Sequence, residues 1–239
     1  MTVLDLDLWD RGQPELIFHY TSAGAIAAIL DSGILRFNSL ERTNDPRETK
    51  EYQFAFTTQG RNMPEYVTAD AMNEHNAKVN DIIQKNVFIA CFTTDDVGLA
   101  NADQPIGHGR RGFGRARNWH QYADQHRGAV LAFDRYILEA QLRELVSDSV
   151  AEKVFYSDIQ RDIDEDGNQF TWQPEHLEDP EASARLILTE KRRQFFLTKY
   201  TDWASEREYR LLAFTQDRPE LPIADSFAGI RARKGLSRR

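Results

Sequence analysis

Residues 86–94, NVFIACFTT, form the strongest predicted strand of the chain, and this strand limits the possible folds most. The run is apolar at consecutive positions instead of alternating between apolar and polar residues. Such a strand is expected to be buried on both faces of its sheet. The chain must therefore supply further elements that pack against both sides of this strand.

Other segments show strand or helix patterns of ordinary length. A helix is expected after residue 22, because Ser22 is a good N-cap and Gly33 suits the left-handed position after a helix. Residues 64–85 have a helical but polar pattern, which predicts a surface helix. Further strands are expected at 16–20, 34–40, 129–134, 152–158 and 206–214, and further helices at 118–128, 136–146 and 180–197.

The order of these elements favours an α+β fold. Strands and helices mix without strict βαβ alternation and without an internal repeat, which predicts a mixed or antiparallel sheet flanked by helices. A chain of 239 residues is compatible with a single domain. Within it we expect an N-terminal extension at 1–14, an acidic surface insertion at 158–178, and a basic tail at 228–239 with neither strand nor helix character, which is expected to fray.

Charge and composition exclude several classes of protein. The net charge of −8 argues against general binding to a nucleic acid backbone, although basic blocks occur at 108–117 and 231–239. Cys91 is the only cysteine, which excludes an intrachain disulfide and a cysteine-rich zinc site. No apolar run reaches the length of a membrane span, and the N-terminus lacks the pattern of a secretory signal. We therefore expect a cytoplasmic protein without a membrane partner.

His19 is the first candidate site residue. It lies at the end of the predicted first strand, beside the start of a helix, and Tyr20 and Thr21 follow it. This position suits a hydrogen bond to a ligand hydroxyl. A buried histidine bonded to the backbone is the alternative.

The segment NDPRE offers a second group of polar residues. Asp45 and Glu48 could join His19 at a metal, as a metal-dependent nuclease would require. A turn in which the Asn44 and Asp45 side chains bond their own backbone explains the same residues. No pair of histidines with ligand spacing supports the metal site, so no metal is predicted.

Residues 112–128, GFGRARNWHQYADQHRG, combine glycines, arginines and aromatic residues. Arg115 and Arg117 can pair with phosphates, and Trp119 and Tyr122 can stack on a flat ring. This combination suits a nucleotide pocket, although core packing explains the aromatic residues equally well. The segment is neither a Walker loop nor a dinucleotide fingerprint.

Two glutamates in the stretch WASEREYRLL form the third candidate site. Glu206 and Glu208 are two residues apart, so on an extended chain they point to one face. They could be exposed carboxylates paired with Arg207 and Arg210, which would stabilise the protein little. Alternatively, one of them could hold a sugar hydroxyl and stabilise positive charge on an anomeric carbon.

These segments together resemble a family of mostly bacterial proteins, domain of unknown function 2971. The most specific elements are H-Y-T, N-D-P, W-x-x-Y and W-x-x-E-x-E-Y-R. Asn118 departs from the pattern, because an apolar residue, often Met, is expected before Trp119. The resemblance extends from about residue 17 to 214 and rests on 18–48, 90–96, 112–134, 154–158 and 202–212.

The layout is also similar, more distantly, to the ADP-ribosyltransferase superfamily. The resemblance implies an ADP-ribosyltransferase-like split sheet and NAD as substrate, with His19 on a ribose hydroxyl. Tyr122 or Trp119 would stack on nicotinamide, and Glu208, assisted by Glu206, would hold the nicotinamide ribose.

This resemblance implies an NAD-dependent ADP-ribosyltransferase or NAD glycohydrolase, in the context of a toxin or phage-defence effector. The sequence leaves open whether its acceptor is a protein or a nucleic acid. Two alternatives remain: a non-catalytic nucleotide-binding sensor, and the metal-dependent nuclease using His19, Asp45 and Glu48.

Overall fold

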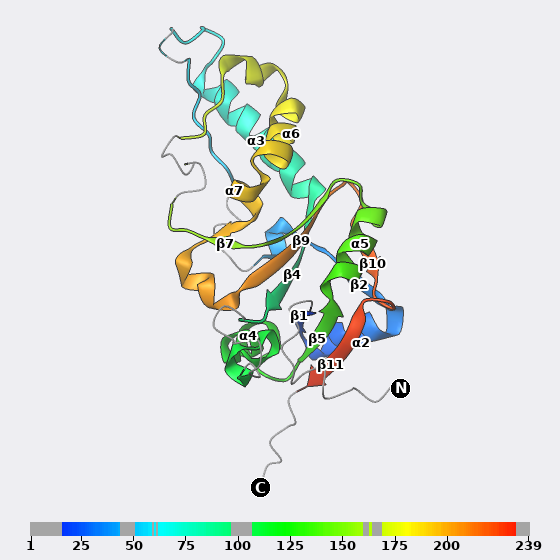
Figure 1. Cartoon of the computed structure of the whole chain (residues 1–239). Coiled ribbons are helices and arrows are strands. Elements are labelled where there is room, and N and C mark those ends of the chain that lie inside the picture. Colours follow the sequence, from blue (N-terminus) through cyan, green and yellow to red (C-terminus); the bar gives the residue numbers. More distant parts are fainter. Residues whose placement is uncertain are drawn as a thin grey trace.

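A computed structural model describes residues 16–43, 51–58, 60, 62–96, 107–159, 163 and 169–232. Its centre is an antiparallel sheet with the strand order β11-β5-β1-β4-β9-β6, and β3 also pairs with β4 (Figure 1). The strands are β1 (Leu16–Thr21), β3 (Asn38–Ser39), β4 (Val87–Thr94), β5 (Ala129–Asp134), β6 (Ser149–Lys153), β9 (Glu208–Phe214) and β11 (Phe227–Ala232).

Two small sheets and the helices complete this α+β domain. β10 (Glu220–Pro222) pairs antiparallel with β2 (Ile34–Arg36), and β7 (Phe155–Tyr156) pairs parallel with β8 (Thr198–Lys199). The α-helices are α2 (Ala23–Ser32), α3 (Ala69–Asn86), α4 (Ala116–Tyr122), α5 (Arg135–Leu145), α6 (Pro180–Glu190) and α7 (Arg192–Phe196). The 3-10 helices are η1 (Leu40–Arg42), η2 (His108–Arg110), η3 (Gly112–Gly114), η4 (Pro174–Glu178) and η5 (Thr201–Glu206).

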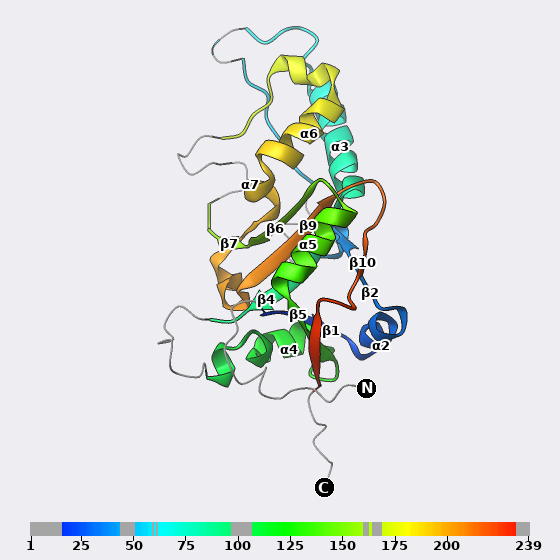
Figure 2. The same cartoon turned by 45° about the vertical axis from the view of Figure 1, so that its right-hand side comes forward.

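One face of the sheet packs against α5, and we call it the α5 face. Phe92, Phe133 and Leu211 of the sheet join Leu138 and Leu142 of α5 in one buried cluster. Figure 2 shows α5 lying across the strands on this side. Ile29 of α2, Leu35 of β2 and Leu221 of β10 extend the same cluster.

The opposite face carries two separate apolar clusters. At one end, Phe18 and Val130 of the sheet pack with Phe113, which lies just before α4, and with Trp119 of α4. At the other end, Ile89 and Leu212 pack against α3, α6 and α7 through Val79, Ile83, Ile187 and Phe195. β4 is thus buried on both faces, as its continuous apolar pattern predicts. Between the two clusters the same face carries polar residues. There Thr93 of β4 lies opposite Glu208 of β9, and Cys91 lies opposite Arg210.

The sheet separates between β1 and β4. These strands pair only at Ile17↔Thr94 and Phe18↔Thr93. β1 nevertheless continues to pair with β5 as far as Thr21, and β4 pairs with β9 from Val87 onward. The two strands therefore diverge after Phe18, in the centre of the sheet.

The first helix follows the sequence prediction closely. The Ser22 hydroxyl accepts a hydrogen bond from the Ala25 amide at 3.2 Å, and Gly33 adopts φ = 67° while its amide bonds the Ile29 carbonyl. The strands at 16–20 and 129–134 and the helix at 136–146 are also confirmed within one or two residues. The helix at 180–197 forms as two consecutive pieces, α6 and α7. None of the helices in the described part of the chain is long and apolar enough to cross a membrane.

The predicted surface helix at 64–85 differs from the observed α3 in two respects. It begins at Ala69, after the Thr68 N-cap, and one side of it is buried. The buried side chains of Asn76 and Asn80 bond the main chain of residues 52–54: the Asn80 Oδ1 accepts from the Tyr52 amide, and the Asn76 amide donates to the Phe54 carbonyl. A polar helix pattern can thus be buried when its amides bind a neighbouring main chain.

Two predictions about the chain periphery were wrong in part. The acidic surface insertion at 158–178 contains Trp172, which is fully buried and exchanges main-chain hydrogen bonds with Ala55 and Thr57. The tail at 228–239 begins as a strand, because β11 pairs with β5 up to Ala232. A strand that completes an existing sheet edge needs little intrinsic strand preference. Residues 1–14 and 233–239 lie outside the described residues.

Candidate functional site

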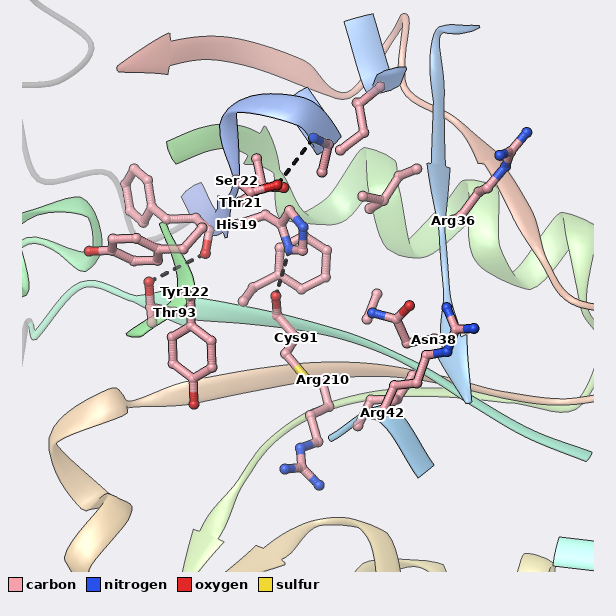
Figure 3. A pocket seen from close by; sticks show the side chains of 18 of the residues that line it. His19, Thr21, Ser22, Arg36, Asn38, Arg42, Cys91, Thr93, Tyr122 and Arg210 are labelled. Atoms are coloured by element: carbon pink, nitrogen blue, oxygen red, sulfur yellow. Dashed lines mark hydrogen bonds between the residues drawn. The ribbon is translucent and has the colours of Figure 1, made fainter. Parts of the chain in front are cut away.

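A cavity of about 680 Å³ opens where β1 and β4 diverge. One side of it is formed by residues 18–22 and by α2, and the opposite side by residues 89–93 of β4. Tyr122 at the end of α4 and Arg210 of β9 line it further along (Figure 3). Lys199, Glu206 and Glu208 also belong to this part of the lining. Its volume lies within the range of small-molecule sites.

His19 lies at the strand separation. Its Nδ1 is 2.9 Å from the Cys91 carbonyl oxygen, and its ring contacts Phe92 at a centroid distance of 5.5 Å. Because a carbonyl oxygen only accepts, Nδ1 carries the proton and Nε2 is the acceptor. Burial lowers the pKa of His19, and the bond to Cys91 opposes this only partly. The imidazole is therefore neutral at neutral pH, and it bonds β4 where the main-chain ladder is interrupted.

Glu206 and Glu208 converge on one ammonium group. The Lys199 Nζ is 3.2 Å from Glu206 Oε2 and 2.7 Å from Glu208 Oε2. The Arg210 Nε is 2.6 Å from Glu208 Oε1, and the Tyr122 hydroxyl donates to Glu206 Oε1 at 2.7 Å. The side chains of Lys199, Glu206, Glu208 and Arg210 are all at most 5% exposed. The alternative of two exposed carboxylates is therefore wrong, although Glu208 does pair with Arg210 as that alternative proposed.

The two carboxylates meet for a different reason than strand alternation. Glu206 ends η5, Arg207 has φ = 46° in the left-handed region, and the extended chain begins only at Glu208. Arg207 itself turns away and pairs with Asp96 at 2.9 Å. A left-handed residue between two different backbone conformations thus brings the two carboxylates together.

The charges around Glu208 keep it ionised. Burial by itself would raise the pKa of Glu208, but the Arg210 guanidinium and the Lys199 ammonium outweigh this and hold the pKa at about 2. Glu206 behaves differently: burial raises its pKa, Lys199 opposes the rise, and the Glu208 charge adds to it. Burial and the Glu206 carboxylate also raise the pKa of Tyr122. One carboxylate of the pair is thus a fixed anion, and the other is the more basic group.

Asn118 adds an unsatisfied donor to the cavity wall. It is 1% exposed, it lines the cavity, and its Nδ2 has no hydrogen-bond partner among the described residues. A buried amide left without a partner costs about 1–3 kcal/mol. A ligand acceptor in the cavity would remove this cost. The departure from the expected apolar residue at this position was the only sequence signal for it.

Tyr20 and Thr21 line the cavity as well, although Tyr20 also has a structural role. Its hydroxyl donates to the Gly112 carbonyl at 2.6 Å. A Cβ on Gly112 would lie 2.3 Å from the Phe18 ring, and one on Gly128 would lie 2.1 Å from the Thr21 carbonyl oxygen. These glycines therefore permit close packing of the α4 segment on β1, and not the approach of a phosphate.

Three predicted ligand-binding residues do not line the cavity. Arg115 donates to the Ser205 and Thr94 carbonyl oxygens, and Arg117 donates to the Asp202 carbonyl and stacks on the Trp203 ring at 4.8 Å. Trp119 is buried, and its indole donates to the Phe113 carbonyl at 2.7 Å. In this arrangement the two arginines hold η5 against α4, and this positions Glu206 opposite Tyr122.

Sequence reasoning missed four basic residues of the cavity. Lys199 lies between the two glutamates, and Arg36, Arg42 and Arg218 line the other end. These residues are distributed over the chain without a common motif, so only their positions in the fold relate them. Asp45 and Glu48, proposed as metal ligands, lie outside the described residues. Within the described residues, no group of three or more His, Cys, Asp or Glu side chains is arranged to hold a metal ion.

Comparison with known proteins shows a similarity to one family over the middle of the chain. Residues 118–211 match the model of a family described as "Protein of unknown function (DUF2971)". The resemblance predicted from the sequence is confirmed over this range, which contains Tyr122, Lys199 and the two glutamates. Searches of curated proteins and of solved structures gave no match.

Proposed function

We propose that this protein binds NAD in the cavity at the strand separation and breaks the bond between nicotinamide and ribose. The ADP-ribose would pass to water or to an acceptor group. The observation that carries this proposal is that His19 and Glu208, more than 180 positions apart, line one cavity together with Tyr122 and Glu206. These are the residue types and the order implied by the distant resemblance to ADP-ribosyltransferases.

The electrostatics of the acidic pair suit the proposed reaction. When the carbon–nitrogen bond breaks, its electron pair leaves with nicotinamide, and the ribose carbon becomes cationic. Glu208 is ionised at neutral pH and lies in a buried environment, where an anion stabilises a nearby cation more strongly than in water. Glu206, the more basic carboxylate, would accept the proton that the attacking water or acceptor hydroxyl loses.

The neighbouring polar groups would orient the substrate. The Nε2 acceptor of His19 suits a ribose hydroxyl, and the unsatisfied Asn118 amide suits the carboxamide oxygen of nicotinamide. Each would form a hydrogen bond that the cavity walls do not already make. Holding the sugar and the leaving group separately favours the geometry needed for bond cleavage.

The test is nicotinamide release from NAD by the purified protein. We expect release by the native chain and at least a 100-fold loss in Glu208→Gln, because the variant removes the anion opposite the developing cation. Glu152→Gln is the matched control, since Glu152 is exposed on β6 beside Arg210 and lies outside the cavity lining.

Glu208→Gln also leaves Arg210 and Lys199 less compensated, so its folding must be followed by circular dichroism and thermal unfolding. Tyr122→Phe provides a milder second variant, because it removes one hydroxyl and no charge. Absence of both nicotinamide release and NAD binding by calorimetry in the native chain would refute the proposal.

The ion pairing of Glu208 favours a second candidate, a nucleotide sensor without catalysis. Both Glu208 oxygens already bond cations, from Arg210 and Lys199. Such a carboxylate can position a ligand through its remaining lone pairs without changing protonation. NAD binding without nicotinamide release, retained in Glu208→Gln, would identify the sensor.

A further inference from the structure

The end of the cavity away from Tyr122 is lined by arginines from three separate segments. Arg36 ends β2, Arg42 ends η1, and Arg218 lies between β9 and β10. In Figure 3, Arg36 and Arg42 lie on one side of His19, and Tyr122 lies on the other. We call these three residues the arginine end of the cavity.

The fold fixes the position of Arg218. Its Nε donates to the Phe37 carbonyl at 2.5 Å, and its Nη2 donates to the Asn38 side-chain oxygen at 3.2 Å. These bonds orient the guanidinium and leave Nη1 without a partner among the described residues. Arg36 pairs with Glu220 at 2.9 Å, but both side chains are at least half exposed, so this pair is weak. Among the described residues Arg42 has no acidic partner.

The charge balance makes this end of the cavity positive. The cavity is lined by five basic residues, and by only three acidic ones, Asp31, Glu206 and Glu208. The two glutamates are already compensated by Lys199 and Arg210. The excess of positive charge therefore lies with the three arginines, in a chain whose net charge is −8. A local positive potential in an acidic protein favours an anionic ligand.

We propose that the arginine end is an anion subsite that binds the phosphate groups of a nucleotide, with Arg42 and Arg218 as its principal ligands. Guanidinium groups match the oxygens of a phosphate in pairs, and Asn38 supplies a further polar group beside them. This inference rests on the proposed function in one respect, because it places the phosphates at one end of the cavity and the ribose at the Glu208 end.

The test is calorimetric binding of ADP, adenosine and pyrophosphate to the full chain. We expect ADP to bind at least 10-fold more tightly than adenosine, with an affinity that falls as the salt concentration rises. Arg42→Ala should weaken ADP binding by about 10- to 100-fold, the usual loss for a charge-assisted hydrogen bond, and leave adenosine binding unchanged.

Arg185→Ala is the matched control. Arg185 is an exposed residue of α6 outside the cavity lining, so its removal changes the net charge equally. We expect its ADP affinity to equal that of the native chain. Arg218→Lys keeps the charge but loses the paired geometry, and we expect an intermediate loss.

Several results would overturn the subsite. They are failure of ADP to bind at millimolar concentration, an unchanged ADP affinity in Arg42→Ala, or an equal loss in Arg185→Ala. Pyrophosphate binding as tight as that of ADP would overturn the assignment to nucleotides. The outcome is separate from that of the proposed reaction: Arg42-dependent ADP binding without nicotinamide release supports the subsite and refutes only the chemistry.

Discussion

Two regions of this protein enclose a histidine, one buried and one half-buried, and they differ in what surrounds it. His75 of α3 is 2% exposed and packs edge-on against the rings of Phe56 and Trp172, and neither ring nitrogen has a hydrogen-bond partner among the described residues. His19 is held to the Cys91 carbonyl and lines the large cavity.

The same contrast holds for buried asparagines. Asn76 and Asn80 of α3 bond the main chain of residues 52–54, whereas the Asn118 amide nitrogen lacks a partner among the described residues and lines the cavity. Burial of a polar residue is therefore not in itself a sign of function. What distinguishes the His19 region is that polar groups from several distant segments line a cavity of about 680 Å³, whereas the pocket beside His75 measures about 270 Å³.

Trp172→Ala should destabilise the α3 region, and we expect the largest loss of stability from this substitution. Trp172 is fully buried among Phe54, Phe170 and His75, so truncation leaves a large cavity. We expect a loss of about 3–5 kcal/mol in the free energy of unfolding, measured in urea. Ligand affinity of the molecules that remain folded should not change. A large loss of ligand affinity in Trp172→Ala molecules that are fully folded would show that the α3 region and the His19 cavity are not independent.

His75 should contribute to the pH dependence of stability, in addition to His19, whose pKa is also lowered by burial. Burial lowers the pKa of His75 to about 4, and the nearby His176 and Lys78 add to this. The unfolded chain binds this proton near pH 6.5 and the folded chain only near pH 4, so stability is lost as pH falls between these values. The full loss of stability from protonation of His75 is on the order of 3 kcal/mol.

His75→Phe should remove the His75 contribution to this slope between pH 6.5 and 4, as followed by urea unfolding at a series of pH values. Phe keeps the aromatic packing and has no group to protonate. His120→Phe, at an exposed position of α4, is the control for the replacement of a histidine by phenylalanine. An unchanged slope in His75→Phe would contradict the assignment.

Asn118→Leu should separate stability from binding in the cavity. Leu removes the unsatisfied buried donor, so we expect the protein to gain about 1 kcal/mol, which corresponds to a melting temperature about 2–4 °C higher. NAD binding should weaken about 10-fold, because the ligand loses one hydrogen bond. Thermal unfolding and calorimetry measure the two effects. A less stable variant with unchanged NAD affinity would mean that Asn118 serves the fold alone.

Much of the local structure was predictable from the sequence. The Ser22 cap and the Gly33 termination define α2, and the continuous apolar run of residues 87–92 correctly indicates a strand buried on both faces. The burial of one side of α3 was not predictable, because its amides bond a segment 20 to 30 residues earlier in the chain. The tail strand β11 depends in the same way on an available sheet edge.

The candidate site was predictable only as a set of separate residues. His19, Tyr122, Glu206 and Glu208 could be singled out by residue type and local context, and they do line one cavity. Arg115, Arg117 and Trp119 had the same kind of signal, yet they hold the α4 segment in place. Lys199 and the arginine end gave no signal, since their positions become related only after folding.

The sequence by itself determined where α2, β4 and β5 begin, because caps, apolar periods and glycines act within a few residues of each other. It also determined which chemical groups the protein has available. Only the tertiary structure decided that β1 and β4 separate, that Lys199 lies between two carboxylates, and that one cavity has an acidic and an arginine-lined end. These features depend on contacts between distant segments, whose relative positions are set by the packing of the whole core.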